Sequence, residues 1–499
     1  MNRKAALLFA AGCTWLGLVA ACAAVAGGTG GGGWTNARVI TVVPAVDTYL
    51  NTDSISRSMW CDSPTNCTVA YSGARSKVWA VSEVDGSWHT PVPVPGLTGT
   101  YFMLDVSCTG PGDCLAGSAG VTGGLQAAQV AAQLNGVWGR GRNVPGLASL
   151  SSGGISDVTA LSCGAGGWCA VAGEYGSAGG TLYGSAGHPL TPYLTTVHGG
   201  TWVKAEQVPG LAALKAKGWT STISTASCGT GGWCAAGGSY RDRSSGRPVP
   251  FVVTGRDGTW GRAHPIGNAA DGDTAITAIS CTTLGNCSAV GTRATSAGAT
   301  WPFVVTERNG TWGQPEAVPG ISLGRTFVAA AITDLACTAP GDCVLTGFYG
   351  ATSEDCGGEY NFCYQGNYSA TVPFVASQVN GTWLAAREVP GLAALNRGGI
   401  TLITSVSCDT PGHCAAGGLT TGLGESARIR GFVISESDGA WGQPEQVPGL
   451  AALRSVGSEV DFAFCDHDAG PAPECIAIGS YGTARPGSPW KRHLFATGN

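Results

Sequence analysis

The residues best suited to contact a ligand lie in one segment, Ala351 to Thr371. It holds three carboxylates and four aromatic rings around the cysteines Cys356 and Cys363. Acidic and aromatic side chains together suit a polar ligand with an apolar face, such as a sugar or a peptide. The alternative is a loop that its two cysteines staple for its own stability. The ligand-binding candidates in this segment are Glu354, Asp355, Glu359, Tyr360, Phe362, Tyr364 and Tyr368.

A second set of candidates recurs six residues after the second cysteine of a pair. If a strand ends at that position, these side chains form a ring around one rim of the fold. The alternative is that the aromatic rings pack between neighbouring repeats with only the hydroxyl exposed. The residues at this position are Tyr175, Tyr240, Arg293, Tyr349 and Tyr481.

Motifs for catalysis are weak. The stretch Gly320 to Gly324 matches the hydrolase nucleophile pattern by letters, but its first glycine belongs to a recurring Val-Pro-Gly turn and no strand-to-helix elbow surrounds Ser322. No His-Glu-x-x-His, phosphate-binding loop or EF-hand loop is present. The sequence therefore predicts no cofactor and no metal, and favours a protein that is not an enzyme. Carboxylates that could still form an acid–base pair are Glu174, Asp242, Glu354, Asp355 and Glu359.

The cysteines indicate disulfides. Of 20 cysteines, all but Cys13 and Cys22 fall into close pairs, seven of them with five intervening residues. Zinc is the alternative, but its two-to-four-residue spacing is absent and the 7 His do not recur beside the pairs. We therefore expect an oxidising compartment. The predicted bridges are Cys61-Cys67, Cys108-Cys114, Cys163-Cys169, Cys228-Cys234, Cys281-Cys287, Cys337-Cys343, Cys356-Cys363, Cys408-Cys414 and Cys465-Cys475.

The N-terminus has the layout of an export signal, because a short basic start precedes an apolar run from Ala5 to Ala26. Three readings stay open for residues 1–26: lipidation at Cys22, ordinary cleavage before Gly27, or an uncleaved anchor long enough to cross a bilayer. Residues 27–33 then form a Gly-rich tether, and residues 34–499 form the folded domain.

That domain is built from repeats. One unit recurs eight times, and each copy has four short β-like runs separated by Gly, Pro or Asn, as in a propeller blade. We name the runs A to D, with the cysteine pair between A and B and an Asn-Gly or Asp-Gly hairpin turn between C and D. Residues 125–134 have local helix propensity, but their place in the repeat predicts a strand. The tryptophans that mark strand D are Trp34, Trp88, Trp138, Trp202, Trp260, Trp312, Trp383 and Trp441.

The two ends of the domain complete each other. It opens with a strand D at Trp34 that has no A, B or C before it, and it finishes with a strand C at Leu494 to Thr497. An open array would instead need polar caps at both ends. The sequence therefore predicts an all-β fold, a single eight-bladed β-propeller of four-stranded blades that the N-terminal strand closes.

The hairpin turns carry a family resemblance. Ser82 to Trp88 and Ser435 to Trp441 read Ser-x-x-Asp-Gly-x-Trp and resemble the Asp-box turn of sialidases and related BNR-repeat propellers. The family's arginine triad and catalytic Tyr/Glu pair match no residues here. Eight Trp-containing repeats are also similar to the quinoprotein and outer-membrane-assembly lipoprotein propellers. The resemblance implies a secreted bacterial repeat propeller.

Composition and net charge limit the classes of molecule that the protein is expected to bind. Gly is 80 of 499 residues, charged residues are 12%, and the net charge of -5 comes with no basic stripe. We therefore expect no nucleic-acid partner, membrane contact only through the N-terminus, and a monomer. The leading interpretation is an exported, envelope-associated or secreted protein whose D-to-A and B-to-C loops recognise a glycan or an extracellular protein. The alternatives are a carbohydrate-active enzyme, hydrolase or lyase, on the same face, and a scaffold for envelope assembly.

Overall fold

The computed structural model describes residues 33–42, 57–73, 76–99, 104–122, 125–151, 154–177, 189–267, 274–294, 300–321, 329–350, 371–396, 399–421, 428–466, 474–483 and 491–499. The chain divides into two compact units, Met1–Gly33 and Trp34–Asn499, and the second carries the fold described below. The expected export signal with Cys22, and the acidic and aromatic segment with Cys356 and Cys363, lie outside the described residues.

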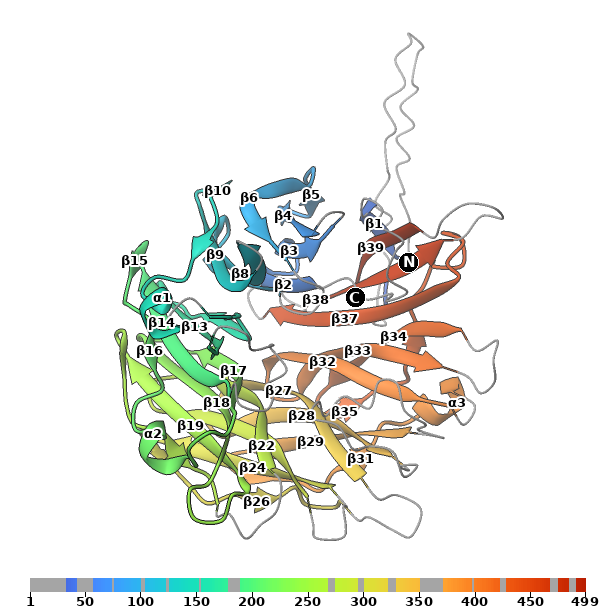
Figure 1. The fold of residues 1–499 in the computed structure, drawn as a ribbon. Coiled ribbons are helices and arrows are strands. Elements are labelled where there is room, and N and C mark those ends of the chain that lie inside the picture. Colours follow the sequence, from blue (N-terminus) through green and yellow to red (C-terminus); the bar gives the residue numbers. More distant parts are fainter. Residues whose placement is uncertain are drawn as a thin grey trace, which may run out of the picture. The chain divides into compact units, whose positions relative to one another are not determined.

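The second unit is a β-propeller of eight four-stranded blades, as the repeats predict (Figure 1). The outer strand D is broken into two short pieces in blades 1 to 7, and both pieces pair with strand C. In the order A to D, blade 1 has β2 (Arg57–Ser63), β3 (Asn66–Ser72), β4 (Lys77–Val84), β5 (Ser87–Trp88) and β6 (Val92–Thr98); blade 2 has β7 (Leu104–Gly110), β8 (Asp113–Thr122), β9 (Leu125–Leu134), β10 (Val137–Trp138) and β11 (Arg142–Asn143); and blade 3 has β12 (Ala160–Cys163), β13 (Trp168–Tyr175), β14 (Thr191–His198), β15 (Thr201–Trp202) and β16 (Glu206–Gln207). Blade 4 has β17 (Ser221–Cys228), β18 (Trp233–Arg241), β19 (Pro248–Arg256), β20 (Thr259–Trp260) and β21 (His264–Pro265); blade 5 has β22 (Thr274–Cys281), β23 (Cys287–Ala294), β24 (Thr300–Arg308), β25 (Thr311–Trp312) and β26 (Glu316–Ala317); and blade 6 has β27 (Ala329–Ala339), β28 (Asp342–Gly350), β29 (Thr371–Val379), β30 (Thr382–Trp383) and β31 (Arg387–Glu388). Blade 7 has β32 (Thr401–Thr410), β33 (His413–Thr421), β34 (Ile429–Ser437), β35 (Ala440–Trp441) and β36 (Glu445–Gln446), and blade 8 has β37 (Gly457–Asp466), β38 (Glu474–Thr483), β39 (Lys491–Gly498) and β1 (Arg38–Val42).

The N-terminal strand closes the ring, which confirms the prediction. β1 pairs antiparallel with β39, with Val39 opposite Phe495, so the eighth blade takes its outer strand from the start of the domain. The Thr35 amide also donates to the Gly498 carbonyl at 2.7 Å. Trp34, only 7% exposed, packs in the apolar cluster between blades 7 and 8. The eighth blade therefore has four strands, although its outer strand comes from the other end of the domain.

The apolar core lies between blades and not within them. Each pair of neighbouring blades shares one cluster of buried side chains; Tyr71 of blade 1, for example, packs with Ile476 and Leu494 of blade 8. Serine hydroxyls add polar links at the same interfaces. The Ser227 hydroxyl of blade 4 accepts from the Cys281 amide of blade 5 at 3.0 Å, and serines that precede the first cysteine of other blades do the same. Because both faces of the sheets are buried against neighbouring blades, little sheet surface is left for charged side chains, which explains their low share of the sequence.

The disulfides staple one face of the propeller. Eight of the nine predicted bridges lie within the described residues and are formed, each between strands A and B of one blade. Cys281 and Cys287, for example, are directly opposite each other with a Cα–Cα distance of 4.1 Å. The C-to-D turn lies beside them, since the Gly310 amide donates to the Gly285 carbonyl at 2.8 Å. Asn309 and Gly310 have φ of 50° and 78°, as a type I′ hairpin requires. We call this side the disulfide face; the D-to-A and B-to-C loops leave from the opposite side.

Within the described residues, three D-to-A connections contain a single helical turn, namely α1 (Leu147–Ser151), α2 (Leu211–Leu214) and α3 (Leu392–Asn396). Each follows a Val-Pro-Gly turn, and the glycine before α2, Gly210, has φ of 79°. The first leucine of each turn is buried between blades, with Leu211 at 2% exposure. Among the described residues no helix is both long and apolar enough to cross a membrane.

Candidate functional site

The candidate tyrosines after the second cysteine lie at or within two residues of the end of their B strands, with Tyr175 the last residue of β13. Tyr175, Tyr240 and Tyr481 are buried, and Tyr349 is partly buried. Their rings pack in the apolar clusters between neighbouring blades. Tyr349 also contacts Phe374 of its own blade, with ring centroids 4.8 Å apart. The Tyr175 hydroxyl accepts a hydrogen bond from the Gln207 amide. Arg293 occupies the corresponding position of β23, opposite Trp301 and partly buried. Ligand contact by these residues stays a prediction.

Blade 4 joins a D-to-A connection to a B-to-C loop. Residues 211–220 precede β17 and residues 241–247 link β18 to β19; we call these two segments the blade-4 loops. The Ala216 amide donates to the Arg241 carbonyl at 2.7 Å, and the Arg243 amide donates to the Leu214 carbonyl at 3.0 Å. Lys215 and Asp242 form an antiparallel β-bridge. Backbone hydrogen bonds therefore hold the two loops together as one surface on a rigid scaffold.

Trp219 is the exposed aromatic side chain of this surface. It is 49% exposed, and the Arg241 guanidinium carbon lies 4.6 Å from its ring centroid. Arg241 also donates from Nη1 to the Gly246 carbonyl at 3.1 Å. A cation held over an indole fixes the ring while leaving part of it in water. An exposed, oriented tryptophan beside hydrogen-bonding side chains suits the apolar face of a sugar ring.

The charges around Trp219 have separate roles. The Asp242 carboxylate accepts from the Ser244 amide at 3.0 Å and the Ser245 amide at 2.8 Å, and both serine hydroxyls also donate to it. These hydrogen bonds, the Ser244 hydroxyl first, hold the pKa of Asp242 at about 2. Lys215 donates from Nζ to the Thr191 hydroxyl at 3.2 Å, and partial burial lowers its pKa. The Asp242 carboxylate thus stabilises its own loop, and the cationic side chains are the charged groups that could contact a ligand.

Asp157 and Glu174 form a pair of buried carboxylates in blade 3. The Glu174 amide donates to Asp157 Oδ1 at 2.7 Å, and the Ile223 amide donates to Glu174 Oε1 at 3.1 Å. Burial raises the pKa of Asp157 to about 7. Burial, and then the neighbouring Asp157 charge, raise the pKa of Glu174 well above its usual range. Asp157 is 0% exposed and Glu174 is 7% exposed, so this pair is enclosed by the fold and does not face a substrate.

A second group of buried carboxylates recurs on the disulfide face. Glu83, Glu307 and Glu436 each pair across the strand with the tryptophan five residues later. Burial raises the pKa of Glu83 and of Glu307 to about 7. They lie in blades 1, 5 and 7, so no two of them form an acid–base pair. The repeated five-residue spacing to the tryptophan was the sequence signal for these positions.

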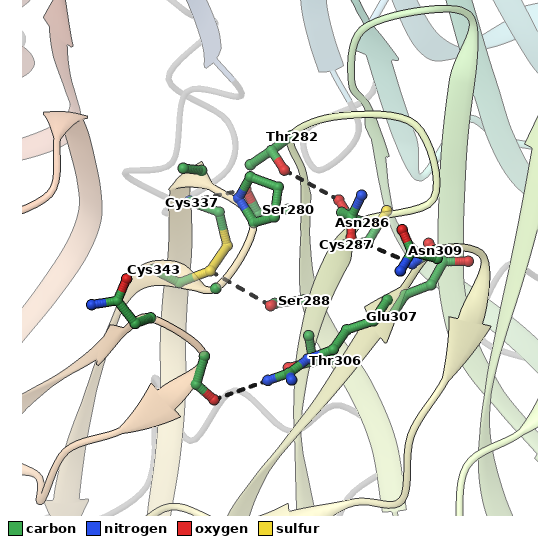
Figure 2. Close-up of a pocket in the computed structure, with 16 residues that line it drawn as sticks. Ser280, Thr282, Asn286, Cys287, Ser288, Thr306, Glu307, Asn309, Cys337 and Cys343 are labelled. Carbon is green, nitrogen blue, oxygen red and sulfur yellow. Dashed lines mark hydrogen bonds between the residues drawn. A yellow bond between two sulfur atoms is a disulfide. The ribbon is translucent and has the colours of Figure 1, made fainter.

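The disulfide face also holds a cavity of about 200 Å³ between blades 5 and 6. Figure 2 shows hydrogen bonds between several of the residues that line it. The Ser280 hydroxyl accepts from the Cys337 amide at 3.1 Å, and the Thr282 hydroxyl donates to the Asn286 carbonyl at 3.4 Å. A smaller cavity, about 90 Å³, lies at the corresponding place between blades 6 and 7. The exposed aromatic ring and the cations lie on the blade-4 loops and not in these cavities, so we place the candidate site on the blade-4 loops.

Comparison with known proteins gives fold neighbours and no family. No known family model matches the chain, and no curated protein matches it. A polysaccharide lyase of family PL25, an ulvan lyase bound to a disaccharide repeat, is 10% identical with a TM-score of 0.43, over 84% of this chain and 96% of that one. The fucose-specific lectin of Aleuria aurantia is 12% identical with a TM-score of 0.31, over 68% and 96%. The Trypanosoma rangeli sialidase is 10% identical with a TM-score of 0.36, over 93% of this chain and 58% of that one.

These comparisons correct one expectation from the sequence. The lack of catalytic motifs favours a protein that is not an enzyme, but the similar structures include a lyase and sialidases as well as lectins. The preference against catalysis is therefore wrong as a conclusion from sequence. Its physical basis was also weak, because propeller enzymes can assemble a site from single residues on many loops, which leaves no contiguous motif.

Proposed function

We propose that the protein is exported and recognises a glycan through the blade-4 loops. The observation that carries this proposal is the half-exposed Trp219 ring, which Arg241 orients at 4.6 Å on two loops joined by backbone hydrogen bonds. An indole offers a flat apolar surface to the C–H face of a sugar, and its fixed orientation lowers the entropy lost on binding.

Export is part of the same proposal. Eight disulfides within the described residues require an oxidising compartment to form and persist. A stapled ring that keeps its shape outside the cell is suited to hold a shallow binding surface in place.

The test is retention of the full-length, oxidised protein on a panel of immobilised polysaccharides, scored also for released reducing or unsaturated ends. Wild-type protein is expected to be retained by at least one polysaccharide, and Trp219→Ala is expected to weaken that retention about tenfold or more. Val137→Ala is the matched control, because this side chain is 72% exposed on the disulfide face of blade 2.

Each outcome has a consequence. Loss of retention in Trp219→Ala alone supports the proposal, and released ends in addition would show that the bound glycan is also cleaved. Retention that both variants keep in full would place glycan binding elsewhere and contradict the proposal. Failure of every polysaccharide to retain the wild-type protein would contradict it as well.

A further inference from the structure

We propose that the ligand of the blade-4 loops is an acidic glycan, bearing carboxylate or sulfate groups, and not a neutral one. This inference rests on the proposed function, since it names the class of glycan for the same surface. It is carried by the number of cations on these loops, of which glycan recognition uses only Arg241.

The blade-4 loops concentrate positive charge in an acidic protein. The whole chain has 27 Lys and Arg and a net charge of -5, yet these two short loops hold five cations and one acidic residue. The carboxylate of the acidic residue, Asp242, accepts hydrogen bonds from the serines of its own loop. The cationic residues are Lys215, Lys217, Arg241, Arg243 and Arg247.

The fold holds these cations on the two joined loops that also carry Trp219. Arg243 donates from Nη2 to the Ala212 carbonyl at 3.3 Å, which ties the second loop to the first. Lys215 and Arg241 are held by Thr191 and by the Trp219 ring. Lys217, Arg243 and Arg247 are exposed. A cluster of like charges raises the local concentration of an anion and orients it on approach.

The exposed aromatic ring favours an anionic sugar over anions that have no apolar face. A half-exposed indole on the same two loops as the cations, with Arg241 over its ring, matches a sugar that is apolar on its face and anionic on its edge. Nucleic acid instead needs a basic stripe that follows a phosphate backbone, and the net charge of this chain opposes one.

The experiment measures affinity for four soluble probes: a polygalacturonate hexasaccharide, a chondroitin sulfate hexasaccharide, a neutral cellohexaose and single-stranded DNA. The test variant is Lys217→Gln with Arg247→Gln, because both residues are exposed and their loss keeps Arg241 over Trp219. The matched control is Arg256→Gln with Arg308→Gln, which removes two exposed cations from the disulfide face.

We expect at least one acidic hexasaccharide to bind more tightly than cellohexaose, and its affinity to fall as NaCl rises from 50 to 300 mM. The test variant should lose about threefold to tenfold in affinity for that probe, and the control variant should lose none. The carboxylate and sulfate probes then show which anion is preferred, and binding of either supports the inference.

The two proposals fail in different ways. If cellohexaose binds as tightly as the acidic probes, salt has no effect and Trp219→Ala removes binding, then glycan recognition stands and the acidic preference is wrong. If no saccharide binds, the proposed function itself is wrong. If DNA binds as tightly as the acidic hexasaccharides and the test variant loses both equally, the loops capture any polyanion and the inference is overturned.

Discussion

The Arg241 guanidinium lies over the Trp219 ring, with its central carbon 4.6 Å from the ring centroid, although 21 residues and one whole hairpin separate the two in the sequence. Arg241 is the last residue of β18, and Trp219 precedes β17, so the antiparallel pairing of these strands brings the two together. The scaffold therefore fixes the arginine, and the arginine fixes the ring. Three consequences for the fold and one for the site can be measured.

The first prediction concerns this contact. Arg241→Met keeps an unbranched apolar stem but removes the charge over Trp219 and the hydrogen bond to the Gly246 carbonyl. We expect glycan affinity to fall about fivefold or more, because the ring loses its fixed orientation. Titration followed by Trp fluorescence measures it, with the melting temperature as a check on folding. Unchanged affinity in a folded variant would show that the ring needs no such support.

The second prediction concerns pH and the buried pair in blade 3. Burial raises the pKa of Asp157 from 3.8 to about 7, so the folded state holds a proton that the unfolded state has released across that window. The stability contributed by protonated Asp157 is therefore fully present below pH 3.8 and is lost as the pH rises through about 7. Asp157→Asn keeps the acceptor for the Glu174 amide and should raise the melting temperature at pH 8.

The matched control for this experiment is Asp257→Asn, because that carboxylate is largely exposed beside Arg256. It should leave the pH profile of the melting temperature unchanged. At pH 4 the Asp157→Asn gain should disappear, since the native carboxyl is then protonated as well. An equal gain at both pH values would contradict the assignment.

The third prediction concerns closure of the ring. Trp34→Ala removes a side chain that is 7% exposed and packs with Val433, Tyr481 and Phe495. Loss of a buried Trp should destabilise the fold by about 3–5 kcal/mol. Thermal unfolding measures this, and Trp219→Ala, on an exposed ring, is the comparison that should cost far less. Equal effects of the two changes would mean that the N-terminal strand does not close the eighth blade.

The fourth prediction separates the two faces. Replacing Cys281 and Cys287 by Ala opens a loop closed by a sequence separation of 6, which should cost roughly 2 kcal/mol. Glycan affinity should not change, because the staple lies on the disulfide face and the blade-4 loops lie on the other. Unfolding and binding of the same preparation give both values. A large loss of affinity in the folded variant would show that the disulfide face takes part in binding.

Repetition made the fold predictable. Residues 125–134 show why: Gln and Ala favour a helix locally, yet the segment forms β9 because Val130 and its neighbours are buried between two adjacent blades. Eight copies of the cysteine pair and of the Gly-x-Trp turn outweighed that local preference. The ring closure followed from matching the two incomplete ends.

The site was harder to predict, because repetition marks what the blades share and a site depends on where one blade differs. Trp219 lies outside the Gly-x-Trp series, in a D-to-A connection whose exposure shows only once β17 and β18 are paired. The spacing rule found Tyr240, two residues from Asp242, but the ring at that position packs against Phe251. Only the fold places the exposed indole one loop away.

The most direct test of the account is hydrogen exchange of the full-length protein with and without the polysaccharide that retains it. The account predicts that added protection is concentrated in residues 211–220 and 241–247, and that Trp219→Ala abolishes it. Protection centred instead on the cavity beside Ser280 and Cys337 would contradict the account, because the glycan would then lie on the disulfide face.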